Sequence, residues 1–210
     1  MGTLGTPATL AGPTASVSGL AFAPGGTLVA AEEDGTIGLW EAAGSILVSS
    51  VPTGHFVRVL TGRLSAVRSV AFSPDGSMLA GAGPDDQVRL WDVASGSQKA
   101  SLVGHTASVR SVAFSVDGAT LASAGDDRTV RLWHVSDRAL LATLQGVDVG
   151  AVAFTSRSHR LAGADGRGVL FWDTDPARVV SRICRDHPAL TQAQWQLYLP
   201  PDQPYELVCP

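Results

Sequence analysis

The residue types best suited to chemistry in this sequence are a histidine, a serine and an aspartate near the centre of the chain. They are His105, Ser123 and Asp127, and Trp133 stands six positions after the aspartate. A serine, a histidine and an acid can form a nucleophile, its general base and the group that orients the base. The same side chains can instead bond to one another in a core, because buried imidazole, hydroxyl and indole N–H groups each need a partner. The repeats that surround them favour the structural interpretation.

Other catalytic and metal-binding patterns are absent from the sequence. A phosphate-binding loop needs glycines ahead of Lys-Ser or Lys-Thr, but the one lysine, Lys99, precedes Ala100. The remaining histidines are not spaced from one another or from carboxylates as metal ligands are; they are His55, His134, His159 and His187. The acidic pairs in turn sequences, Asp85-Asp86 and Asp126-Asp127, are not followed by a ladder of alternating oxygen ligands. We therefore predict no catalytic residue, no metal and no cofactor.

The composition limits the classes of function further. The chain has 210 residues, of which 45% are hydrophobic and 16% charged, and its net charge is -4. This charge gives no field for binding polyanions, so nucleic acid is not an expected partner. The first cationic side chain is Arg58 and no apolar run approaches the roughly 18 residues of a membrane span, which predicts a cytoplasmic protein without membrane association. Cys184 and Cys209 are too few for a disulfide scaffold, and the arginine and alanine bias is typical of bacteria.

An internal repeat organises the chain. The segment 69–76, SVAFSPDG, recurs at 111–118 as SVAFSVDG, and weaker copies surround Phe22 and Phe154. Each copy has a phenylalanine followed after 18 or 19 residues by a tryptophan, in the pairs Phe22 and Trp40, Phe72 and Trp91, Phe114 and Trp133, Phe154 and Trp172. Alternating apolar residues and glycine-containing turns within each unit predict an antiparallel meander. Four strands in about 42 residues correspond to one propeller blade.

The details of the repeat carry a family resemblance over residues 7–185. Gly104-His105, the turn at Asp127, the VRLW sequence at 130–133 and the dipeptide Trp91-Asp92 together resemble the WD-repeat β-propeller family. The resemblance implies that His105, Ser123, Asp127 and Trp133 form a buried hydrogen-bonded set. The other copies depart from it: the serine positions hold Ala31, Gly81 and Gly163, and the histidine positions hold Pro13, Arg63 and Val147. We expect those three blades to be less rigid than the third.

The predicted fold is therefore all-β, a partial propeller of four four-stranded antiparallel blades with a short C-terminal tail. The blades are expected at 14–54, 62–103, 104–145 and 146–185, with a strand-like lead at 7–12. The stretch 56–62 resembles a second fourth strand after the first blade, either a remnant of deleted blades or a loop insertion. The tail, 186–210, is similar to the closing segment of bacterial WD-repeat proteins and is expected to pack on the blades or to dock a partner.

Four blades are too few for the usual ring. Full-size blades of this family would cover about half a circle and leave apolar end faces exposed. Three solutions remain open from the sequence: a homodimer that completes the ring, a closure of four blades, or a fragment of a longer protein.

The resemblance implies a non-catalytic scaffold that binds a protein or peptide on one propeller face. In the family, ligands contact residues beside the turn aspartates and at the start of the first strand of each blade. The residues at these positions of this sequence are Arg68, Asp86, Arg110, Asp126 and Arg128. Arginines rimmed by carboxylates suit an acidic or mixed-charge peptide. Two alternatives remain, a propeller hydrolase or lyase with a central site, and a degenerate fragment of a larger regulator linked to an NTPase or kinase.

Overall fold

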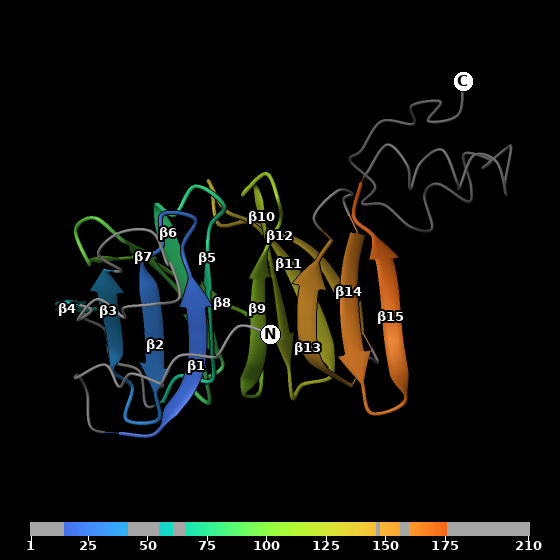
Figure 1. Ribbon diagram of the computed structural model, residues 1–210. Coiled ribbons are helices and arrows are strands. Elements are labelled where there is room, and N and C mark those ends of the chain that lie inside the picture. Colours follow the sequence, from blue (N-terminus) through green and yellow to red (C-terminus); the bar gives the residue numbers. More distant parts are fainter. Residues whose placement is uncertain (1–14, 42–54, 61–65, 146–147, 156–159, 176–210) are drawn as a thin grey trace, which may run out of the picture.

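The chain folds into a series of antiparallel sheets (Figure 1). The computed structural model describes residues 15–41, 55–60, 66–145, 148–155 and 160–175. The first sheet contains β1 (Val17–Phe22), β2 (Leu28–Glu32), β3 (Ile37–Glu41) and β4 (His55–Val59). The second contains β5 (Ser69–Phe72), β6 (Met78–Ala82), β7 (Gln87–Asp92) and β8 (Gln98–Val103). The third contains β9 (Val109–Phe114), β10 (Thr120–Gly125), β11 (Thr129–His134) and β12 (Leu140–Gln145). The fourth contains β13 (Val149–Phe154), β14 (Arg160–Asp165) and β15 (Gly168–Asp173).

The strands of every sheet pair with their sequence neighbours, as expected for a meander. The predicted all-β class and the repeated antiparallel sheets are confirmed. Turn chemistry explains the sharp reversal between β5 and β6, where Gly76 has a φ of 72° and Asp75 accepts hydrogen bonds from its neighbours. The Ser73 hydroxyl, followed by the hydroxyl and backbone N–H of Ser77, lowers the pKa of Asp75 to about 2. The carboxylate therefore stays ionised and holds the turn across the ordinary pH range.

Apolar side chains fill the spaces between consecutive sheets. One hydrophobic cluster joins the first and second sheets around the fully buried Ile37 and Trp91. The next joins the second and third sheets around Leu90 and Trp133, and a further cluster joins the third and fourth around Val130 and Leu161. The strands β1, β5, β9 and β13 lie side by side in this order, so each sheet packs on the next like the blades of a propeller.

Serine side chains also connect neighbouring sheets, a feature that the sequence analysis missed. Ser69 Oγ accepts the backbone N–H of Val112 at 3.1 Å, and Ser111 Oγ accepts that of Val152 at the same distance. Each bond satisfies an inner-strand N–H with a hydroxyl from the preceding sheet. The available signal was the serine shared by the two SVAF copies, which the first copy replaces by Gly19.

The structure corrects the expected end of the first blade. We expected this blade to span 14–54, but its fourth strand is β4, in which Phe56 pairs with Trp40 and Val59 with Gly38. The stretch described from sequence as a second fourth strand is thus the strand that pairs with β3. Composition did not distinguish it from the preceding stretch, because valine and other apolar residues that favour strands occur in both. Residues 42–54 lie outside the described part of the chain.

A second correction concerns the serine position of the first copy, which we had assigned to Ala31. The register pairs Leu20 with Ala30, just as it pairs Val112 with Ser123 in the third sheet. The equivalent of Ser123 is therefore Ala30, because a shift by one residue moves a side chain to the opposite face of a strand.

The four sheets form an open series. Sheet contacts run from first to second, second to third and third to fourth, and β4 and β15 lie at opposite sides of the molecule (Figure 1). This arrangement disfavours closure by four blades. The lead at 7–12, the tail at 186–210, Cys184 and Cys209 lie outside the described residues. Among the residues that are described, no helix is both long and apolar enough to cross a membrane.

Candidate functional site

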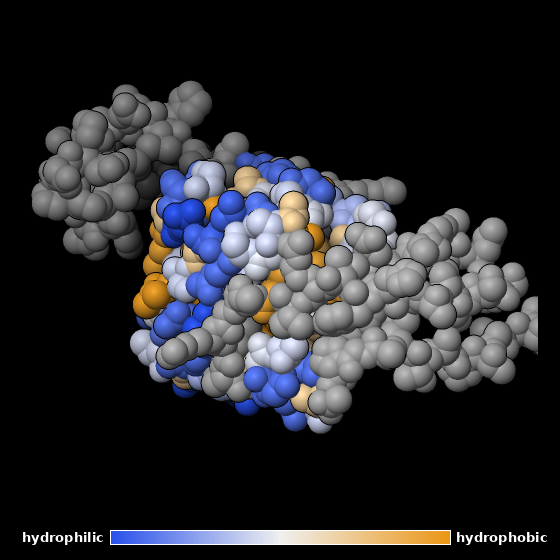
Figure 2. All heavy atoms as spheres, turned by 90° about the vertical axis from the view of Figure 1, so that its left-hand side faces the viewer, coloured by the Kyte–Doolittle hydropathy of each residue, from blue (hydrophilic) through white to orange (hydrophobic). Residues whose placement is uncertain are grey.

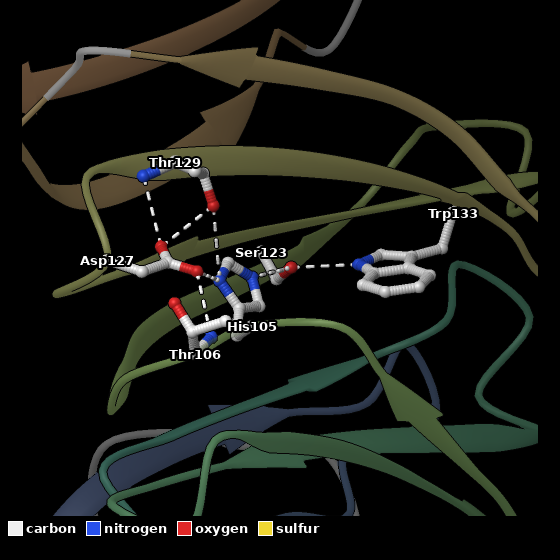
Figure 3. Close-up of polar contacts among 6 residues, drawn as sticks. All are labelled: His105, Thr106, Ser123, Asp127, Thr129 and Trp133. Carbon is white, nitrogen blue, oxygen red and sulfur yellow. Dashed lines mark hydrogen bonds and ion pairs between the residues drawn. The ribbon is translucent and has the colours of Figure 1, made fainter.

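Four side chains predicted to interact form one hydrogen-bonded chain in the third sheet (Figure 3). Trp133, on β11, donates its indole N–H to Ser123 Oγ at 2.8 Å. Ser123, on β10, lies 2.7 Å from His105 Nε2, and His105 Nδ1 lies 2.9 Å from a carboxylate oxygen of Asp127. The strand pairing of β10 with β11 places the serine beside the tryptophan, while the turn between these strands carries the aspartate. We call these four residues the tetrad.

The partners determine the direction of the hydrogen bonds. An ionised Asp127 can only accept, so His105 donates from Nδ1 and its unprotonated Nε2 accepts the hydroxyl proton of Ser123. The serine oxygen then accepts the indole N–H of Trp133, so every polar side-chain group of the tetrad has a hydrogen-bond partner. Asp127 also accepts the Thr106 N–H at 3.1 Å and the Thr129 hydroxyl at 2.7 Å. One carboxylate therefore ties the loop before β9 to the turn before β11.

Burial and hydrogen bonding set the charge states of the tetrad. Desolvation lowers the pKa of His105 from its ordinary 6.5, and this effect outweighs the opposing hydrogen bond and charge of Asp127. Desolvation raises the pKa of Asp127, but hydrogen bonds from Thr129, Thr106 and His105 outweigh it, so the pKa falls below 3.8. At neutral pH the histidine is therefore neutral and the aspartate is charged.

We expect the protein to lose stability as the pH falls below 6.5. The depressed pKa of His105 means that its contribution is complete above pH 6.5 and is lost as the pH falls from 6.5 towards the lower folded-state pKa. Asp127 adds a further loss below pH 3.8. Guanidinium unfolding at about pH 7.5 and about pH 5.5 tests this, with His105→Gln reducing the difference between the two pH values. An equal difference in wild type and variant would contradict this role of His105.

The geometry gives these residues a structural role. The Ser123 side chain is fully buried, and its oxygen is enclosed by the bonds to His105 and Trp133. A nucleophile must reach its substrate, and this serine has no open path to one. Within the described ranges, His, Cys, Asp and Glu side chains nowhere gather in threes that could ligate a metal.

The second sheet fills the same region differently. Gly81 replaces the serine, and a Cβ there would lie only 2.9 Å from the ring of Trp91, so the indole occupies the space of the missing side chain. Asp85, which aligns with Asp127, forms a 2.5 Å ion pair with the buried Arg89. The partner of this turn aspartate has thus changed from a histidine of the preceding loop to an arginine of β7. The fourth sheet repeats the packing of a tryptophan ring against glycine, at Gly163 and Trp172.

The first sheet uses a buried glutamate. Glu32 aligns with Gly125, whose Cβ position would lie 2.7 Å from His105 Nδ1. Glu32 is 1% exposed and accepts the backbone N–H of Ala15 at 3.0 Å. In the third sheet, the ring of His105 enters this region from the loop before β9. In the first sheet, the side chain of Glu32 enters the equivalent region from β2. The histidine positions Pro13, Arg63 and Val147 lie outside the described residues.

The structure brings three of the five predicted face residues together. Asp126 contacts Arg110 of its own sheet directly and lies 3.9 Å from Arg68 of the second sheet. The side chains of both arginines are about half exposed, at 47% and 50%. Asp126 also stands next to Asp127, so the tetrad and this ion-pair cluster share one turn. We call Arg68, Arg110 and Asp126 the arginine cluster.

Asp86 and Arg128 occupy equivalent turn positions of neighbouring sheets. Both have a φ of 61°, a conformation that glycine adopts more easily, and the first sheet has Gly35 with a φ of 87° at this position. Asp86 is close enough to His105 for its charge to affect the pKa of that histidine. In the part of the chain that the structure describes, neither residue has an ion-pair partner. The two charges are therefore not neutralised by an ion pair within the described residues.

Comparison with known proteins agrees with this architecture. The family described as WD domain, G-beta repeat matches residues 6–41, 54–92 and 96–134, more than half of the chain. The second and third matched segments each contain the fourth strand of one sheet and three strands of the next, β4 to β7 and β8 to β11.

Similar curated proteins cover only part of the chain. The meiotic recombination protein rec14 of Schizosaccharomyces pombe is 46% identical over 55 residues, 26% of this chain and 18% of that protein. The nuclear distribution protein PAC1 of Arthroderma otae is 37% identical over 95 residues, 41% of this chain and 19% of that protein. The WD repeat and SOCS box-containing protein 1 of Homo sapiens is 38% identical over 82 residues, 38% of this chain and 18% of that protein. The matches thus span at most a fifth of these relatives, and the chain itself belongs to the WD domain, G-beta repeat family.

Proposed function

We propose that this chain is a non-catalytic scaffold that binds an acidic or mixed-charge peptide of a protein partner. The face that binds it contains the arginine cluster, with Asp86 and Arg128 at its edge. The observation that carries the proposal is the position of Asp126 between two half-exposed arginines from adjacent sheets. This arrangement holds two guanidinium groups together at the surface, where one acidic segment can contact both.

The chemistry of the cluster suits carboxylates. A guanidinium presents several N–H donors in a plane and binds a carboxylate through two of them. Asp126 uses part of this donor capacity, and the exposed remainder is accessible to a ligand. Because the existing ion pairs are exposed, each contributes little to folding stability, and a peptide carboxylate can compete for the arginines at low cost.

Rigid support is the second argument for this face. Asp127, buried in the tetrad, holds the turn that presents Asp126 and Arg128. Binding residues held on a fixed turn lose little conformational freedom when a ligand binds. The alternative of a hydrolase or lyase needs acids or histidines that converge on a substrate, whereas the described histidine at this end, His105, is buried.

Charge reversal tests the proposal. Arg68→Glu with Arg110→Glu should abolish the binding of acidic peptides on an array graded in net charge, because four units of charge change at the face. Lys99→Glu with Arg138→Glu makes the same change in charge at the other end of the sheets and should leave binding intact. Equal binding by wild type and both double variants would show that the arginine cluster is not the binding site.

A further inference from the structure

The first sheet exposes apolar residues whose equivalents in the other sheets pack against the preceding sheet. Leu20 and Phe22 on β1 are both 63% exposed. Their equivalents on β5, Val70 and Phe72, are 8% and 9% exposed and pack against the first sheet. Val17 shows the same contrast, at 56% exposed against 0% for its equivalents Val67, just before β5, and Val109 on β9. The inner strand of the first sheet therefore presents an unoccupied half of the interface between blades, which we call the leading face.

The fourth sheet exposes the complementary half. Val169 and Phe171 on β15 are 59% and 64% exposed. Their equivalents on β7, Val88 and Leu90, are 0% and 1% exposed because the third sheet covers them. We call the surface formed by Val169 and Phe171 the trailing face. Figure 2, viewed from the left-hand side of Figure 1 and thus from the side away from the fourth sheet, shows apolar patches within a largely hydrophilic exterior.

These two faces fit one another because the chain already contains their interface three times. In each of the three internal clusters, β-branched and leucine side chains of one sheet pack against valine, leucine and aromatic side chains of the next. A leading face and a trailing face therefore bury each other in a packing that this sequence already forms. Exposed apolar faces of this kind mark sites of association.

We propose that a second copy of this chain covers both faces, head to tail, so that two chains form a closed ring of eight sheets. The leading face of each copy packs on the trailing face of the other, which gives two identical interfaces related by a two-fold axis. Known propellers close with about four to eight blades, so two chains of four sheets close within that range and three chains exceed it. This inference is independent of the peptide-binding proposal, because the arginine cluster is complete within one chain.

The interface between copies lacks a hydrogen bond that two of the three internal interfaces contain. Ser69 and Ser111 accept an N–H from the following sheet, but Ala151 occupies their position in the fourth sheet. The N–H of Leu20 in the second copy thus meets a methyl group, which makes this interface weaker than the two internal interfaces that contain the serine bond. Ala151→Ser should supply the missing acceptor at both interfaces of the ring, so an effect of about 5-fold for each bond tightens the dimer by about 25-fold.

Light scattering after size exclusion, over a range of concentrations, tests the ring. Wild type should have the mass of two chains, whereas Leu20→Glu and Phe171→Glu should each weaken association by about 100-fold or more, because each places a charge in an apolar contact. Both side chains are exposed in the single chain, so circular dichroism should show that the sheets remain folded. Val103→Glu, at an exposed position on the outer strand β8, is the control and should stay dimeric.

Mixing the two variants distinguishes head-to-tail packing from other dimers. A Leu20→Glu chain retains its trailing face and a Phe171→Glu chain retains its leading face. The mixture should therefore recover a heterodimer through one intact interface, which neither variant forms alone. A wild-type monomer at all concentrations would overturn the proposal, as would assemblies larger than two chains. It would also fail if only one of the two variants lost association, because that pattern indicates like faces packing together.

Discussion

Asp127→Ala should lower the free energy of unfolding by about 3–4 kcal/mol. The carboxylate is 4% exposed and accepts hydrogen bonds from the ring of His105, from the N–H of Thr106 and from both donors of Thr129. Alanine leaves these donors without an acceptor, and a buried donor that loses its partner costs its full desolvation free energy. Guanidinium unfolding, followed by tryptophan fluorescence, measures the loss.

The neighbouring Asp126→Ala is the matched control for this change. It removes a carboxylate from the same turn, but one that is 29% exposed and pairs with half-exposed arginines. Surface ion pairs of this kind contribute about 0–1 kcal/mol. If the two alanine variants unfolded at the same denaturant concentration, the tetrad would not be the element that stabilises the third sheet.

Gly83→Ala should have an effect of at least about 3 kcal/mol, because the new methyl group has no room. A Cβ on Gly83 would overlap the backbone carbonyl oxygen of Ala66 and lie 3.1 Å from the carbonyl carbon. Backbone cannot move aside as a flexible side chain can. The carbonyl of Gly83 also accepts the N–H of Val109 at 2.9 Å, so displacement would disturb the contact with the third sheet as well.

Two other glycines calibrate this result. Gly25→Ala adds a methyl group where nothing lies within 4 Å, so its unfolding free energy should stay within about 0.5 kcal/mol of wild type. Gly81→Ala should have an intermediate effect, because its Cβ meets the ring of Trp91 and not backbone. Hydrogen exchange of β5 and β9 would show whether the damage from Gly83→Ala reaches both sheets, and a stability equal to that of Gly25→Ala would contradict the steric argument.

Much of the architecture could be predicted from sequence because it depends on local signals. Alternating apolar residues and Asp-Gly turns specify strands that pair with their neighbours, and this pairing then brings Ser123 beside Trp133. The repeat carried the resemblance to the WD-repeat family, and that resemblance named the four residues that the structure joins by hydrogen bonds. The sequence did not identify the fourth strand of the first sheet, because two stretches had similar composition. Only the pairing of Phe56 with Trp40 distinguished them.

The contacts between sheets were decided only by the tertiary structure. Asp126 lies between arginines of two different sheets, and Asp85 pairs with Arg89, although these aspartates belong to equivalent turns. No periodicity distinguishes such partners, because they depend on how twisted sheets stack and on which neighbouring side chain fills the space.

The first and fourth sheets also show which features depend on sequence and which on tertiary structure. The sequence by itself determined that there are four similar units and that their inner strands are apolar. Only the packing revealed that Leu20 and Phe171 are exposed where equivalent positions in the other sheets are buried. The physical reason is that burial depends on whether another sheet covers a residue. The same apolar residue therefore lies in the core of a middle blade and on the surface of a terminal blade.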